Sequence, residues 1–515
     1  MCRPLLKLAA VLSVMLTLRP LYGDAGATTD YSQLPLQYEV SSDPEQQQYH
    51  LYDFIWRSFI ALNWPNVPIT IEEGRDGPRI VSGMRGMPDA STPLAVMSGS
   101  GNLPQAVWET YKEPFEVFPP RDRWGESGDW NSVRPLPPKT SPNARQLLGF
   151  PMELTGYATD TLQPYFFPHS TGPLYDQSGG LVRYEVAVNR AFFRYIRHFG
   201  YYNAERQVAA VKNYLAGIRD DTAFQRPPFG NPREIGPGGY LNKVPKYAQT
   251  GFVDAKAAWR VLDRNKPHQI ERYLHREIVV GFDRDGRPQT ELMGLVALHI
   301  LRWTPNGYDP AKGVDGAFVA STFEQIDNVR TNVDRHGNVV KPTFNNGELP
   351  SMEQREFGFA GDIPQLGGRP VSIFRAAAQT IPEAVQKLNK HYQTSFPVNT
   401  SVLQYYELIG TQNRHQGSVE FATTEDRERN GHQGPITGVY TNANNLVNSA
   451  LESYSQKNFS CILCHVQARP LGILTAKPSQ LPTFPEKAFE DDHFKILTFL
   501  LQMAQPPSQK PQKVR

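Results

Sequence analysis

The chain has 515 residues, 39% of them hydrophobic, and its 53 basic and 51 acidic side chains give a net charge of +2. This length and hydrophobic content predict a large core and two or three globular domains. The nearly balanced charge argues against nucleic acid as a partner. The three cysteines, Cys2, Cys461 and Cys464, argue against a fold that several scattered disulfides stabilise.

Residues 1–27 have the pattern of a secretory signal peptide. Arg3 and Lys7 precede an apolar run, residues 8–18, and Ala25-Gly26-Ala27 is typical of a cleavage site. This largely apolar run of 11 residues is shorter than the roughly 20 apolar residues that a membrane-spanning helix needs. A retained anchor is therefore the weaker alternative. We expect a periplasmic or secreted bacterial protein without an integral membrane segment after signal cleavage.

Residues 28–435 are predicted to form a mixed α+β region of one or two domains. Apolar residues recur at helical spacing in residues 51–62, and this helix should stop before Pro65. Two apolar runs on either side of Asp285-Gly286 predict a hairpin of two strands within residues 277–303. Residues 316–329 contain a further strand candidate. The apolar positions of the first helix are Leu51, Phe54, Ile55, Phe59 and Leu62.

Residues 114–151 are rich in proline, glycine and serine, which predicts a long surface loop without regular structure. Trp124 and Trp130 would either contact a ligand there or fix the loop to the core, and the second interpretation is favoured. Glu324 and Asp327 in residues 316–329 are an acid/base or cation-binding pair in one interpretation. Surface carboxylates or carboxylates that form hydrogen bonds are the favoured alternative.

The local triplet Cys461, Cys464 and His465 carries the most specific signal in the chain. Residues 444–460, which precede it, are predicted to form a helix followed by a loop. A structural zinc site would need two more ligands from elsewhere, and a redox dithiol would need a strand before the motif. A local disulfide between the two cysteines, with no redox or cofactor role, is a further alternative. The spacing Cys-x-x-Cys-His favours covalent attachment of one haem c, with two thioether bonds and His465 as the proximal iron ligand.

We expect residues 436–505 to form a small helical, cytochrome c-like haem segment and residues 506–515 to be a disordered tail. The loop at residues 466–492 contains neither methionine nor histidine, so the sixth iron ligand is not evident. The candidates are His299, His493 and Met503. Core packing is the favoured role for His299 and Met503, and a solvated side chain is the favoured role for His493. An open sixth position is a further alternative.

Several blocks of the chain resemble exported bacterial c-type cytochrome-like proteins that carry one Cys-x-x-Cys-His motif near the C-terminus and a large upstream region. The resemblance implies haem and export, and it does not imply an activity for the upstream region. The blocks are WRSFIALNWP, AVWETYKEP, VDAKAAWRVL, LVALHI, FVASTFEQIDNV and NSALESYSQKNFSCILCH.

The leading hypothesis is an exported mono-haem c-type cytochrome that transfers single electrons to a redox partner protein. The alternative is an exported haem enzyme, an oxidoreductase whose upstream region binds a small-molecule substrate. A third possibility is a scaffold in which haem only stabilises the C-terminal segment.

Overall fold

A computed structural model describes most of the chain between residues 29 and 504. The described residues are 29–74, 77–119, 129–132, 172–285, 287–364, 367–415, 446–458, 461–465, 468, 470, 492–494, 498, 500–501 and 504. The expected signal peptide, residues 1–27, the expected boundary at residue 436 and the expected tail all lie outside these residues. Among the helices that are described, none is both long and apolar enough to cross a membrane.

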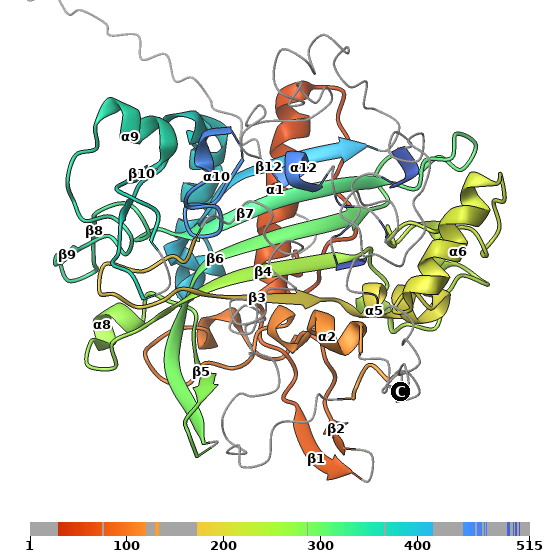
Figure 1. The fold of residues 1–515 in the computed structure, drawn as a ribbon, viewed down its shortest axis with the longest axis horizontal. Helices are drawn as coiled ribbons and strands as arrows, with labels where there is room; N and C mark the ends of the chain where they lie inside the picture. The colour runs from red at the N-terminus through yellow and green to blue at the C-terminus, as the bar shows by residue number, and fades with distance from the viewer. Residues whose placement is uncertain are drawn as a thin grey trace, which may run out of the picture.

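An antiparallel sheet of six strands forms the centre of the molecule (Figure 1). The strand order is β12-β7-β6-β4-β3, and β5 forms a hairpin with β6. The predicted hairpin and the predicted strand at residues 316–329 are therefore confirmed. The strands are β3 (Arg183–Val188), β4 (Val253–Val261), β5 (His275–Phe282), β6 (Pro288–Thr304), β7 (Ala317–Gln325) and β12 (Tyr406–His415).

Helices and three small two-stranded sheets surround this sheet, so the predicted α+β class is confirmed. The small sheets are β1–β2 (Thr70–Gly74, Gly77–Ser82), β8–β9 (Asn332–Val333, Val339–Val340) and β10–β11 (Phe359–Ala360, Ser372–Ile373). The described α-helices are α1 (Pro44–Leu62), α2 (Pro114–Val117), α5 (Arg190–Phe199), α6 (Ala204–Leu215), α7 (Pro232–Ile235), α8 (Pro267–Ile270), α9 (Met352–Phe357), α10 (Glu383–Thr394) and α12 (Cys461–His465).

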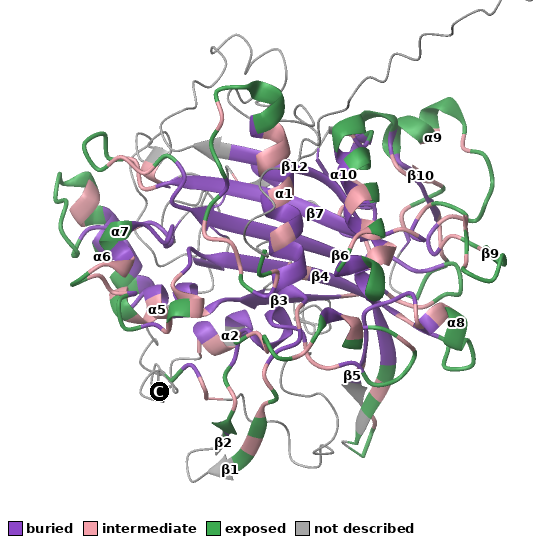
Figure 2. Cartoon of the chain, turned by 180° about the vertical axis from the view of Figure 1, so that it is seen from behind, coloured by how far each residue is buried: buried purple, intermediate pink, exposed green. Residues whose placement is uncertain are grey.

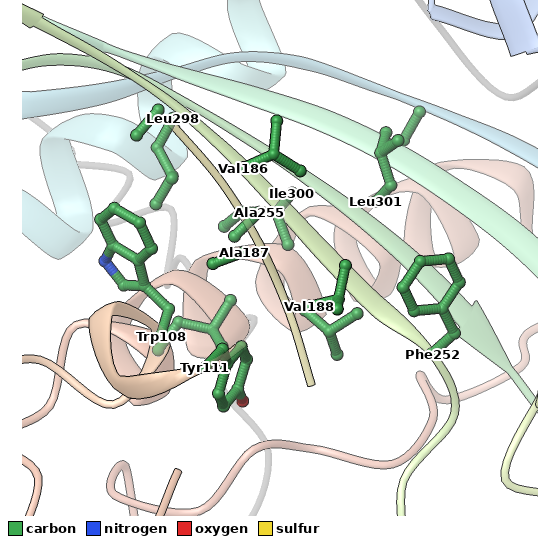
Figure 3. Close-up of a cluster of buried hydrophobic side chains, with 14 of the residues drawn as sticks. Trp108, Tyr111, Val186, Ala187, Val188, Phe252, Ala255, Leu298, Ile300 and Leu301 are labelled. Carbon is green, nitrogen blue, oxygen red and sulfur yellow. The ribbon is translucent and has the colours of Figure 1, made fainter. Parts of the chain in front are cut away.

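Helix α1 covers one face of the sheet (Figure 2). It starts seven residues earlier than predicted, because Asp43 caps it by accepting a hydrogen bond from the Gln46 N–H at 2.9 Å and Pro44 fits the first turn. Its apolar side enters the core as the periodicity predicted, and Phe59 stacks on Phe323 of β7 with 4.0 Å between ring centroids. The same core contains Trp108 and Tyr111, which lie beside Ala187, Val188, Ala255 and Leu298 (Figure 3).

The predicted loop at residues 114–151 is wrong at its start. Residues 114–117 form α2, because Glu113 and Glu116 make a reciprocal capping box around it. Trp130 is buried, and its indole N–H donates to the Arg85 carbonyl at 3.2 Å, as expected of a side chain that fixes the chain to the core. Trp124 and residues 133–151 lie outside the described residues.

The predicted helix before the cysteine motif is also wrong at residues 446–458, which form turns and one 3₁₀ turn on the sheet. Side-chain oxygens accept hydrogen bonds from the N–H groups of Val447, Asn448, Ser449 and Ala450 at 2.7–3.2 Å. These N–H groups are thus satisfied by side chains, which compete with helical hydrogen bonding.

Candidate haem-binding site

The cysteine motif forms α12, a single helical turn that carries Cys461, Cys464 and His465. Cys461 and His465 are four residues apart, so they share one side of this turn, and Cys464 belongs to the same turn of the backbone. Helix α12 is held at its start: the Cys461 N–H donates to the Leu446 carbonyl at 3.2 Å, and the Ile462 N–H donates to Gln412 Oε1 at 3.0 Å. Two of the N–H groups that a helix start leaves unpaired are thereby satisfied.

Helix α12 lies on the face of the sheet opposite α1 (Figure 1). Side chains alternate along a strand, and in β7 Phe323 contacts α1 while Phe318 contacts His465 with 5.5 Å between ring centroids. The described residues of the C-terminal segment share the core of the sheet, which includes Ile462, Phe494 and Leu500.

An aromatic row borders His465. Phe318 packs edge-on against Trp303 with 4.8 Å between centroids, and Trp303 stacks on Phe252 at 4.5 Å. The indole Nε1 of Trp303 is buried without a hydrogen-bond partner in the described structure. Apolar rings and an unused donor beside a Cys-x-x-Cys-His turn fit a porphyrin, which has apolar faces and carboxylate-bearing side chains. The residues present thus have the donor chemistry for one covalent haem.

His299 lies on the same sheet face as α12, within β6. It pairs in register with Thr322 of β7, which is four residues, or roughly 13 Å, along the strand from Phe318. Its Nε2 lies 2.8 Å from Glu452 Oε1, while its Nδ1 is buried and has no hydrogen-bond partner among the described residues. Burial raises the pKa of Glu452, but the nearby His299 and Lys256 outweigh this and hold the pKa below its usual value.

His493 is only partly exposed and packs against neighbouring rings, so the expected fully solvated role is wrong. Its ring stacks on Tyr214 of α6 with 4.0 Å between centroids, and its Nε2–H donates to the Phe224 carbonyl at 2.7 Å. Burial, together with the charge of Arg226, lowers the pKa of His493 to about 3. It lies in a 3₁₀ turn, Asp492–Phe494. Met503 lies outside the described residues.

The acidic pair at the end of β7 forms buried ion pairs, which agrees with the favoured structural role. Asp327 accepts two hydrogen bonds from Arg272, both at 2.7 Å. Glu324 accepts from Arg375 Nη2 at 2.9 Å and from the N–H and hydroxyl of Ser449, each at 2.7 Å. Neither carboxylate is available as a general base while these bonds hold.

Sequence reasoning missed three groups of the site: Gln412 and Phe318 beside α12, and Glu452 beside His299. The first two lie on strands that pair side by side, and only the strand register brings them to the motif. The residue type alone carries no signal of this, because glutamine and phenylalanine are common in strands of any function.

A second cluster of possible metal ligands lies on the surface, at His268, Glu271 and His336. Arg335 already occupies it: its Nη2 is 2.9 Å from Glu271 Oε2, and its Nε donates to His336 Nε2 at 3.1 Å. A guanidinium at this place neutralises the carboxylate and uses an imidazole nitrogen that a metal would need. The cluster is accordingly a surface ion pair with two histidines.

Comparison of this chain with protein-family models, with curated proteins and with solved structures found no match. The functional interpretation consequently depends on the cysteine motif and its surroundings.

Proposed function

We propose that the protein is an exported mono-haem c-type cytochrome that transfers single electrons to a redox partner. Cys461 and Cys464 would hold haem c through two thioether bonds, and His465 would be the proximal iron ligand. The observation that carries the proposal is the presentation of all three residues on one helical turn, α12, beside the aromatic row of the sheet.

The role of each neighbouring group follows from its contacts. Leu446 and Gln412 fix the start of α12 and so fix the backbone of the cysteine motif on the sheet. Phe318 and Trp303 exclude water from the side of His465, and burial of this kind tunes a redox potential. A haem bound here would supply the one-electron couple of its iron.

The haem segment, residues 436–505, is proposed to dock on the sheet as part of the same core. Its described helical elements are α12 and the 3₁₀ turns Gln456–Asn458 and Asp492–Phe494. Export through the signal peptide, residues 1–27, would bring the chain to the periplasm or beyond, where this type of attachment takes place.

The test is expression in a bacterial host with cytochrome c maturation, followed by haem staining of a denaturing gel. We expect haem to stay with the wild-type chain. The amount of attached haem should fall strongly in Cys461→Ser and in Cys464→Ser. In His465→Ala haem should stay attached, but the absorption spectrum of the axially ligated iron should change. His268→Ala, an exposed histidine outside the motif, is the matched control. Well-expressed wild-type protein without stain would overturn the proposal.

The second candidate is an exported haem oxidoreductase with a small-molecule substrate, and one observation in the upstream region bears on it. A cleft of about 760 Å³ lies between α10 and the start of β12, away from α12. A large cleft fits a ligand-binding role for the upstream region. Carbon monoxide separates the candidates, because an enzyme with an open iron binds it readily and a six-coordinate carrier resists it.

A further inference from the structure

The cleft beside α10 has walls from four separate parts of the chain. Gln386, Lys390 and Gln393 are spaced by four and three residues on α10, so they form one stripe of the helix. Arg330 and Arg375 come from the segments after β7 and β11, and Figure 2 shows the outer side of α10 exposed. Glu407, at the start of β12, also lines the cleft.

Positive charge dominates this cleft. Its charged lining residues are three cations, Arg330, Arg375 and Lys390, and one carboxylate, Glu407. Arg330 pairs with Glu407 at 2.8 Å and leaves half of its own side chain exposed, at 51%. Lys390 is exposed and forms no ion pair with any described residue. The cleft therefore retains positive charge after its internal ion pair is formed.

Arg375 lines the cleft with a side chain that is 16% exposed. Its Nη2 binds Glu324 at 2.9 Å, which fixes the guanidinium, while its Nη1 is buried and has no hydrogen-bond partner in the described structure. A buried N–H without an acceptor is unfavourable. A planar guanidinium held in this way is suited to a carboxylate or phosphate group.

We propose that this cleft binds a small anion with two or more carboxylate or phosphate groups. Arg375 would bind one anionic group within the cleft, and Lys390 with Arg330 would bind another near its mouth. The site does not depend on haem, because Glu407 lies five residues, or roughly 17 Å, along β12 from Gln412, which holds α12.

Calorimetric titration of the full exported chain at low ionic strength tests the proposal, with citrate and inorganic pyrophosphate as probes and glycerol as the neutral control. We expect saturable binding of citrate, of pyrophosphate or of both, no binding of glycerol, and weakening by added salt. Binding of citrate alone would identify carboxylates as the ligand chemistry, and binding of pyrophosphate alone would identify phosphate groups.

Two lysines of α10 give a matched pair of variants. Lys390→Gln should weaken binding by about tenfold, since a charge-assisted hydrogen bond is lost. Lys387→Gln, on the same helix but outside the cleft lining, should leave affinity unchanged. Absence of saturable binding to both probes, or equal weakening in the two variants, would overturn the proposal. Haem content is measured on the same samples. Anion binding and haem attachment are thus scored independently, so the failure of one proposal can be told from the failure of the other.

Discussion

At the scale of single residues, the two described histidine candidates for the sixth iron ligand differ in chemistry. His493 donates its Nε2–H to a carbonyl and stacks flat on Tyr214. The Nε2 of His299 lies beside Glu452, while its Nδ1 is buried and has no hydrogen-bond partner among the residues that the structure describes. A carboxylate that binds one nitrogen of an imidazole orients the other nitrogen toward a metal. His299 is therefore better prepared than His493 to serve as a ligand.

We expect His299→Ala in the haem-loaded chain to change the axial ligand spectrum and to let reduced protein bind carbon monoxide. His493→Ala should lower stability, because it removes a buried ring and its hydrogen bond, but leave the ligand spectrum as it is. Absorption spectra with and without carbon monoxide make the comparison. A spectrum that changes in His493→Ala but not in His299→Ala would contradict this assignment.

At the scale of elements, residues 446–458 carry the cysteine motif onto the sheet through side-chain hydrogen bonds. Asn448 is the central residue: its amide N–H groups donate to Thr322 Oγ1 at 2.7 Å and to the Phe323 carbonyl at 3.0 Å. Its Oδ1 accepts from the Ala450 N–H at 2.9 Å. The buried amide thus joins β7 to the segment that leads to α12.

Asn448→Ala should lower the free energy of unfolding by about 2–4 kcal/mol, because three buried hydrogen bonds lose a partner. Asn338→Ala is the control, since Asn338 lies exposed in the β8–β9 turn and bonds only to nearby Asp334; its effect should stay within about 0.5 kcal/mol. Chemical denaturation measures both. Equal effects in the two variants would show that the Asn448 bonds do not anchor the segment.

The elements that could be predicted from the sequence are those determined by local pattern. Apolar periodicity predicts helix α1, and a turn between two apolar runs predicts the β5–β6 hairpin. The Cys-x-x-Cys-His motif is evident from three residues that are close together in the sequence. The turns at 446–458 could not be predicted, because the acceptor for the Ser449 N–H is Glu324, 125 residues away. The burial of His493 depends likewise on Tyr214 and Phe224. Contacts of this range leave no periodic signal in the chain.

At the scale of the whole molecule, the two faces of the sheet differ in polarity. The face under α1 is packed mainly with aromatic and aliphatic side chains, and its buried cation, Arg302, donates to the Ser58 hydroxyl of α1 at 2.7 Å. The face under α12 and residues 446–458 includes His299, Glu324 and Gln412, which bind the C-terminal segment through hydrogen bonds. Asp254 of β4 belongs to this polar face, because it pairs in register with Leu301, two residues from His299. Docking of the C-terminal segment thus buries charged groups as well as apolar ones.

Asp254 makes the stability of the fold dependent on pH. Burial raises its pKa from the usual 3.8 to about 7, although Lys256 and Thr498 act in the opposite direction. An acid whose pKa is raised on folding binds its proton more tightly in the folded state. The ionisation of Asp254 therefore lowers the free energy of unfolding. This loss is absent below pH 3.8, grows as pH rises toward 7 and stays constant above pH 7.

Asp254→Asn removes this ionisation and keeps the shape of the side chain. We expect the variant to match the wild type at pH 4 and to be more stable at pH 8, by up to about 4 kcal/mol because each pKa unit corresponds to about 1.4 kcal/mol. Urea denaturation at pH 4, 6 and 8 measures the difference, and it should widen with pH. A variant less stable than the wild type at pH 8 would contradict this prediction. It would mean that the ionised Asp254 carboxylate is stabilised by Lys256, so that the two form a stabilising ion pair beneath the C-terminal segment.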